Sequence, residues 1–100
     1  MDLQINWTLK AKQQLKEILD YWEERNESST YSKKLLKLIN QSILRLQEYP
    51  DIGRMTENSR ARLKIIKDYF LYYSFDQKQL TILGLADMRR NPDYLSSLLD

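Results

Sequence analysis

The stretch from Arg62 to Ala86 reads RLKIIKDYFLYYSFDQKQLTILGLA, and it decides the fold. Its opening RLKI alternates basic and apolar residues, which is typical of a strand. YFLYYSF and LTILGLA are apolar on both faces, and the first of them is rich in the aromatic residues that strands favour. KD and DQKQ are candidate tight turns between these runs. The stretch therefore predicts three strands, near residues 61–67, 69–76 and 79–86, in an antiparallel meander.

The alternation also predicts which way the side chains of these strands point. In the first strand, we expect Leu63 and Ile65 to face inward, with the basic residues between them in solvent. In the second strand, Phe70 and Tyr72 lie on one face, and Leu71 and Tyr73 lie on the other face. If helices cover only that other face, Phe70 is exposed or is covered by another molecule. An exposed apolar strip of this kind marks a partner site.

Two helical patterns precede the meander. Apolar and polar residues alternate near residues 2–7, which predicts a short strand. The apolar spacing then becomes helical near 9–25 and again near 30–48. Thr8 is a plausible N-cap for the first helix, and Asn26 is a plausible end for it. Because only a few polar residues join the two helices, they should form an antiparallel hairpin.

The helical hairpin must bury its apolar stripes, and the sheet offers the only large apolar face. The sequence therefore predicts an α+β fold. Its N-terminal strand and its C-terminal three-stranded meander form a mainly antiparallel sheet, against which the helical hairpin packs. The residues expected in the core are Trp7, Leu15, Ile18, Trp22, Leu35, Leu38, Leu46, Leu63, Leu71, Ile82 and Leu83.

The composition excludes several kinds of chemistry. The chain has 100 residues with no Cys and no His, so it has no disulfide, no thiolate and no imidazole. A Ser-His-Asp triad is therefore impossible, and no metal site or cofactor is expected. A net charge of +2 is too small to indicate nucleic-acid binding by itself. The first residues do not resemble a signal peptide, and no apolar run could span a membrane, so we expect a soluble cytoplasmic protein.

Four segments carry a family resemblance by their order and spacing. They read INWTLKAKQQLKEILDYW, INQSILRLQEYPDIGR, RLKIIKDYFLYYSF and LTILGLADMRRNP, and together they extend over nearly the whole chain. In this arrangement the chain resembles the RelE/ParE superfamily of bacterial toxins from type II toxin–antitoxin systems. The resemblance implies one toxin domain over residues 1–100, which arrests growth and is neutralised by a cognate antitoxin.

The resemblance implies one of two targets. RelE-like members cut messenger RNA in the ribosomal A site, whereas ParE-like members inhibit DNA gyrase. The cutting members use basic strand residues and often a C-terminal aromatic residue to activate the ribose 2′-OH and stabilise the phosphate. Lys64 and Tyr94 fall near such positions, and Arg89 does so after a shift of one residue. Phe70, however, stands where those members carry the arginine that would hold the phosphate.

The resemblance therefore favours a ParE-like toxin that inhibits gyrase. ParE-like members commonly end the last strand with a pair such as Arg89 and Arg90. Two alternatives stay open. One is a RelE-like ribosome-dependent mRNA endoribonuclease, for which Lys64, Arg89 and Tyr94 would be catalytic. The other is a non-toxic interaction module.

Six residues are candidates for contact with partners. The expected target-contacting residues are Arg62, Lys64, Arg89 and Arg90. The competing interpretation of the arginine pair is a surface strand end, with Asp87 or Asp93 as the ionic partner. Phe70 and Tyr72 are the expected antitoxin-binding residues. A homodimer and a toxin–antitoxin hetero-oligomer are both compatible with the resemblance.

Overall fold

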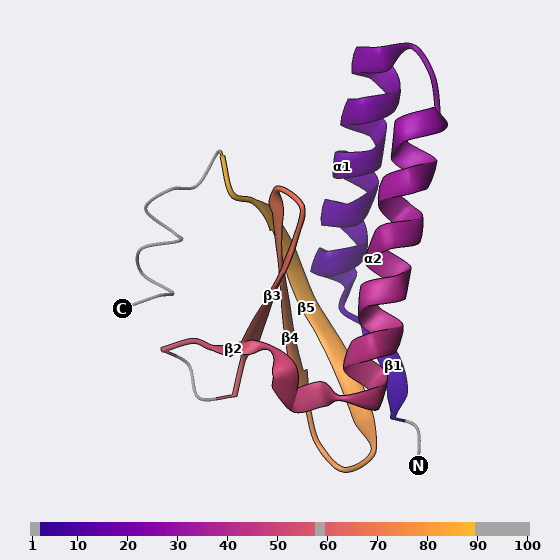
Figure 1. Cartoon of the computed structure of the whole chain (residues 1–100). Helices are drawn as coiled ribbons and strands as arrows, with labels where there is room; N and C mark the ends of the chain where they lie inside the picture. The colour runs from indigo at the N-terminus through magenta and orange to yellow at the C-terminus, as the bar shows by residue number, and fades with distance from the viewer. Residues whose placement is uncertain (1–2, 58–59, 90–100) are drawn as a thin grey trace.

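The computed structural model describes residues 3–57 and 60–89, and it confirms the predicted order of elements. Two long helices stand side by side along one side of a twisted sheet (Figure 1). A short strand and a 3₁₀ turn, which the sequence did not predict, lie between the second helix and the meander. The elements are β1 (Gln4–Trp7), α1 (Leu9–Asn26), α2 (Thr30–Glu48), η1 (Pro50–Ile52), β2 (Arg54–Met55), β3 (Arg62–Ile66), β4 (Tyr69–Phe75) and β5 (Gln79–Asp87).

The sheet has the strand order β1-β5-β4-β3-β2. The pairs β5–β4, β4–β3 and β3–β2 are antiparallel, as tight connections require. β1 pairs with β5 in parallel, from Gln4 opposite Gln79 to Trp7 opposite Ile82. The α+β architecture expected from the sequence is therefore confirmed, with one parallel pair in an otherwise antiparallel sheet.

Local side chains define the ends of the helices. The hydroxyl of Thr8 accepts a hydrogen bond from the backbone N–H of Ala11 at 3.1 Å, which confirms the predicted N-cap of α1. α1 ends at Asn26, and Glu27 follows it in a left-handed conformation with φ of 50°. Ser32 of α2 then donates to a carboxylate oxygen of Glu23 at 3.0 Å, which ties the two helices together. In the described part of the chain, no helix could cross a membrane.

The main core lies between the helices and one face of the sheet. Its buried members are Leu3, Ala11, Leu35, Ile39, Ile43, Leu46, Ile66, Tyr69, Leu71, Tyr73, Leu80, Ile82 and Leu85. Five of the residues expected in the core pack against this cluster but are only partly buried: Trp7, Leu15, Ile18, Trp22 and Leu38. Tyr69 and Tyr73 are buried in this cluster, although they were not on the list of residues expected in the core.

The opposite face of the sheet carries a second, smaller cluster. It consists of Leu63, Phe70 and Tyr72, with Leu83, Ala86 and Met88 partly buried against it. Leu63 is therefore buried as expected, but on the face away from the helices.

The expected orientation of β3 is wrong as a result. Ile65 follows Leu63 onto the far face and is 48% exposed, whereas Ile66 is the β3 residue in the main core. Lys64 pairs with Leu71, so its side chain lies on the helix-covered face and is half-buried. The reason is that side chains alternate, so the choice of face for one residue decides the whole strand.

Candidate functional site

Three of the four expected target-contacting residues are described, and the structure does not bring them together into one basic surface. Lys64 lies opposite Leu71, and Leu71 lies opposite Leu85, four residues before Arg89. Leu85 is two residues before the end of β5, and Arg89 lies in the turn beyond that end. Lys64 and Arg89 are therefore two strands apart, roughly 10 Å across the sheet, with β4 between them. Arg62 is two residues further away. Arg90 and Tyr94 lie outside the described residues.

Arg62 is engaged in holding the turn that precedes β2. Its guanidinium donates to the backbone carbonyl of Asp51 at 3.0 Å and to that of Gly53 at 2.9 Å. The same group lies 5.7 Å from the ring centre of Phe75. Hydrogen bonds from a charged donor to carbonyl oxygens that helices and strands leave open stabilise an irregular segment. Arg62 therefore has a clear structural role in the described part of the chain.

Arg89 follows β5 and is paired with carboxylates. Its backbone N–H and its Nε donate to one oxygen of Asp87 at 2.8 and 3.2 Å, and its Nη2 lies 3.2 Å from the other oxygen. Asp68, in the turn between β3 and β4, lies 3.9 Å away. The hydrogen bond with Asp87 raises the pKa of Arg89, so this residue stays a cation. The ionic partnership with Asp87 considered for a surface strand end is confirmed.

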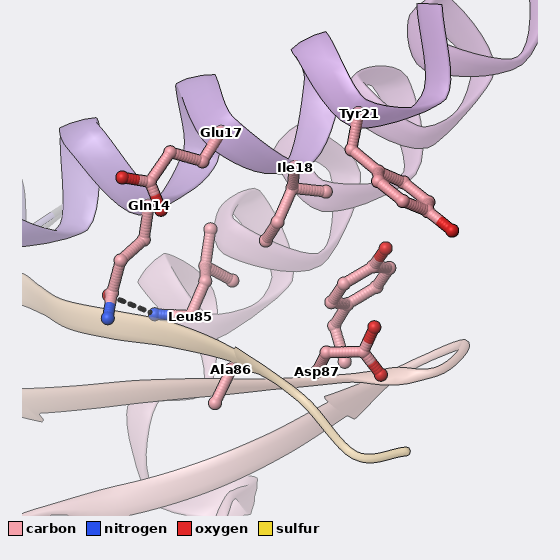
Figure 2. Close-up of a pocket in the computed structure, with 8 residues that line it drawn as sticks. Gln14, Glu17, Ile18, Tyr21, Leu85, Ala86 and Asp87 are labelled. Carbon is pink, nitrogen blue, oxygen red and sulfur yellow. Dashed lines mark hydrogen bonds between the residues drawn. The ribbon is translucent and has the colours of Figure 1, made fainter. Parts of the chain in front are cut away.

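A pocket of about 210 Å³ lies between α1 and the end of β5 (Figure 2). It is lined by Gln14, Glu17, Ile18, Tyr21, Tyr69, Leu85, Ala86 and Asp87. Its two charged lining residues, Glu17 and Asp87, are both acidic. The pocket beside Arg89 therefore disfavours a phosphate group, because carboxylates repel it.

Gln14 is the residue of this pocket that the sequence did not reveal. β1 pairs with β5 only as far as Ile82, so the backbone beyond that point lacks a strand partner on this side. The Gln14 side-chain oxygen fills the gap by accepting a hydrogen bond from the N–H of Leu85 at 2.8 Å, drawn as a dashed line in Figure 2. A glutamine on an exposed-looking helix gives no local signal of such a contact, since its partner is distant in sequence.

The expectation that Phe70 and Tyr72 form an open apolar strip is wrong. Phe70 is fully buried and Tyr72 is 7% exposed. Their ring centres lie 6.3 Å apart, and Leu63 from β3 completes the cluster. The cluster lies on the face of the sheet away from the helices, and its members come from β3, β4 and β5 and the turn that follows β5. Whether Phe70 and Tyr72 contribute to antitoxin binding stays a prediction.

Of the three candidate catalytic residues, only Lys64 and Arg89 are described, and the structure does not bring these two together. Lys64 is half-buried, and its side chain has no hydrogen-bond or ion-pair partner among residues 3–57 and 60–89. Arg89 is held by the acidic side chains of Asp87 and Asp68, beyond the end of β5. Phe70 is inside the protein, so the position that would hold a phosphate offers neither a cation nor access. In the described ranges, no three His, Cys, Asp or Glu residues are grouped to bind a metal ion.

Two buried tyrosines anchor the ends of β4. Tyr69 accepts a hydrogen bond from the indole N–H of Trp22 at 2.7 Å. Tyr73 donates to the carbonyl of Pro50 at 2.7 Å and accepts from the N–H of Gly53 at 2.8 Å. These bonds connect the sheet to α1 at one end and to the η1 turn at the other. They satisfy phenol groups that would otherwise be costly to bury.

These tyrosines predict a loss of stability at alkaline pH. Burial raises the pKa of Tyr69 and of Tyr73 above the ordinary value of about 10. In the unfolded chain each phenol loses its proton near pH 10, and in the folded chain it does so at a higher pH. The stability that the neutral phenols contribute is therefore complete below about pH 10 and is lost as the pH rises through the folded-state pKa.

Urea unfolding at pH 9 and pH 11 measures this effect. We expect the wild-type free energy of unfolding to fall more between these two pH values than that of the double variant Tyr69→Phe/Tyr73→Phe. Tyr49→Phe, at a residue that is 50% exposed, is the control and should fall as the wild type does. An equal fall in all three proteins would contradict the prediction.

Comparison with known proteins agrees with this architecture. The family model of the ParE toxin of the type II toxin–antitoxin system, parDE, matches residues 5–92. A solved chain from the chromosomal ParDE TA system of P. aeruginosa is 20% identical to this chain. The match covers 85% of this chain and 95% of the solved chain, with a TM-score of 0.73. This likeness shows the shared fold.

The TrmO structure from Pseudomonas aeruginosa is 14% identical over 85% of this chain and 35% of its own, with a TM-score of only 0.44. No curated protein matches the chain. The family model, however, extends over most of the sequence and coincides with all the helices and nearly all the strands described above. The chain therefore belongs to the ParE toxin family of type II toxin–antitoxin systems.

Proposed function

We propose that this toxin arrests growth by inhibiting DNA gyrase in the cytoplasm and that a cognate antitoxin neutralises it. Membership of the ParE family supports the proposal, as does the likeness to a chain of a ParDE system. The observation that carries it furthest is the burial of Phe70. A cutting enzyme needs an accessible cation at that position, and here an apolar ring fills the interior instead.

The distribution of the basic residues supports the same choice. A nuclease that acts by acid–base catalysis must bring its proton-transfer groups and its phosphate-holding cation to within hydrogen-bond reach of one phosphodiester. Lys64 lies on β3 and Arg89 follows β5, so they are roughly 10 Å apart across the sheet with β4 between them. Arg89 also shares its charge with Asp87 and Asp68, which weakens its attraction for a phosphate. Inhibition by binding alone does not require such an assembly.

We assign contact with the target to the end of β5, where Arg89 and Arg90 follow the last strand. The side chain of Arg89 is 51% exposed despite its ionic partners, so it can still donate to a target. Arg62 donates to two carbonyls of its own chain and is a weaker candidate. Lys64, half-buried on the helix-covered face, is weaker still.

Parallel assays with the purified toxin test this proposal. We expect gyrase supercoiling to be inhibited and messenger RNA on ribosomes to stay uncut. The double variant Arg89→Ala/Arg90→Ala should stay folded and need about tenfold or more toxin for the same inhibition, as expected when a binding hot spot is lost. The matched control is Lys10→Ala/Lys12→Ala on the exposed surface of α1, which removes the same charge and should inhibit as the wild type does.

Other outcomes would select another function. Cutting of messenger RNA at the A site, abolished by Lys64→Ala or Tyr94→Phe, would establish the RelE-like endoribonuclease. Unchanged growth after induced expression of a folded protein would favour a non-toxic interaction module. The protein encoded by the adjacent reading frame is the candidate antitoxin, and its co-expression should restore growth. Continued arrest would reject it as the neutralising partner.

A further inference from the structure

A second pocket lies between α2 and the turn that joins β3 to β4. Its volume is about 230 Å³, and it is lined by Tyr31, Lys34, Leu35, Lys37, Leu38, Gln41 and Lys67. We call it the lysine-rimmed pocket. Its apolar wall is formed by buried Leu35 and by Tyr31 and Leu38, which are partly buried against the main core. Its volume is below the roughly 300 Å³ at which small-molecule sites begin, so it suits a single inserted side chain.

The rim of this pocket is basic, and no acidic side chain lines it in the described structure. Lys34 and Lys37 are exposed on α2, and Lys67 faces them from the turn between β3 and β4. The imbalance extends along the helix, since the basic residues of α2 are accompanied by one acidic residue, Glu48. In α1, by contrast, Lys and Arg are matched by an equal number of Asp and Glu. Lys34 and Lys37 are thus not part of a helix surface of alternating charge.

Lys67 has a backbone conformation that residues other than glycine rarely adopt. Its φ is 54°, in the left-handed region, where a residue with a Cβ costs about 1 kcal/mol or more. In this conformation the Lys67 ammonium lies 5.7 Å from the ring centre of Tyr31, at the edge of the pocket. Glycine or asparagine would serve the turn better, yet the position carries a lysine that completes the rim.

We propose that the lysine-rimmed pocket binds an acidic segment of the antitoxin, with one apolar side chain inserted between Leu35 and Leu38 and carboxylates beside the lysines. The proposal rests on the proposed neutralisation by an antitoxin and adds the surface that is used. Charge complementarity favours an acidic partner. The apolar wall favours a protein over a nucleic-acid duplex, because the phosphates that lysines contact in a duplex carry no apolar group to fill it.

Variants on α2 and α1 test the proposal with the full toxin and the purified candidate antitoxin. Lys34→Glu/Lys37→Glu reverses two charges on the rim, and Lys10→Glu/Lys12→Glu makes the same charge change on α1. By calorimetry, we expect the first variant to bind about tenfold or more weakly and the second to stay within about threefold of the wild type. Raising the salt concentration should weaken antitoxin binding by the wild type and reduce the difference in affinity between the wild type and Lys34→Glu/Lys37→Glu.

Two bulky substitutions on α2 distinguish binding in the pocket from a general effect of the charge of this helix. Gln41 lines the pocket and Asn40 is its exposed neighbour outside it. Gln41→Trp should obstruct the pocket and weaken binding about tenfold or more, whereas Asn40→Trp should not. Circular dichroism and thermal unfolding would show that both variants are folded.

Each other outcome overturns the proposal in a recognisable way. Equal affinity of all variants, with growth still restored by the antitoxin, would place the interface elsewhere and leave the proposed neutralisation intact. If the wild-type toxin formed no complex with the antitoxin, both the proposed pocket and the proposed neutralisation would be rejected. If the lysines bound duplex DNA or RNA more tightly than they bound the antitoxin, the surface would be a nucleic-acid interface. A toxin dimer that Gln41→Trp abolishes would show that a second copy occupies the pocket.

Discussion

Replacement of Phe70 by alanine is expected to lower the free energy of unfolding by about 3–5 kcal/mol. Phe70 is fully buried on the face of the sheet away from the helices, where it packs with Leu63 and Tyr72. Truncation removes the transfer free energy of the ring and leaves a cavity in this cluster. A domain of this size has only about 5–15 kcal/mol of stability, so the variant should melt at a much lower temperature.

Phe75 provides a matched control on the same strand. It is 37% exposed, and its main contacts are the Arg62 guanidinium and the ring of Tyr73. Phe75→Ala should therefore cost about 1 kcal/mol. Urea unfolding followed by circular dichroism would measure both variants. If Phe70→Ala proved as stable as Phe75→Ala, Phe70 would not be a core residue, and an open aromatic strip for a partner would again be the better interpretation.

The burial of Phe70 also explains why an arginine, as RelE-like members carry, cannot simply be introduced at this position. Phe70→Arg would place a charge in an apolar cluster with no acidic partner among its members. The desolvation cost would unfold the domain or force a rearrangement of the strand. We therefore expect Phe70→Arg to lose structure rather than to gain RNA cleavage.

The second large effect is expected for Gly53→Ala, at about 2–4 kcal/mol. A Cβ at this position would lie 2.1 Å from the Tyr73 hydroxyl and 2.7 Å from two atoms of its ring. The ring cannot withdraw, because Tyr73 is fully buried and its hydroxyl bridges Pro50 and Gly53. The extra methyl group must therefore break these hydrogen bonds or displace the turn. The φ of Gly53 is −69°, so the cost is steric and not conformational.

Thermal unfolding of two further variants checks this explanation. Gly84→Ala is the control, because the atom nearest to its Cβ would be the Gln14 side-chain oxygen at 3.0 Å, which would have to move by only a few tenths of an ångström. It should cost less than Gly53→Ala. In the double variant Gly53→Ala/Tyr73→Phe the closest clash is absent, so its destabilisation should be smaller than the sum of the single changes. Strict additivity would show that the hydroxyl is not the obstacle.

The sequence determined the number, order and kind of the principal elements. The change of apolar period from two to about 3.6 near Thr8, and the return to strands near Arg62, are local signals that survive in any tertiary arrangement. The cap at Thr8 and the two tight turns are local as well. The family resemblance, carried by the same segments, was confirmed by the family model over residues 5–92.

The tertiary structure alone decided which face of the sheet the helices cover. β4 is apolar on both faces, so its pattern could not tell whether Phe70 or Leu71 belongs to the main core. β3 was assigned to the wrong face for the same reason, which placed Lys64 in solvent and Ile65 inside. Only the register of β3 against β4 resolves this, since one residue of shift exchanges the two faces.

The partners of the polar residues were likewise decided by tertiary contacts. Arg62 meets the carbonyl of Gly53, and Gln14 meets the N–H of Leu85, across separations that local sequence patterns do not encode. Arg89 is different, because Asp87 is only two residues away and could be considered from the sequence. Short-range pairing follows from the chain itself, whereas long-range pairing depends on how the layers pack.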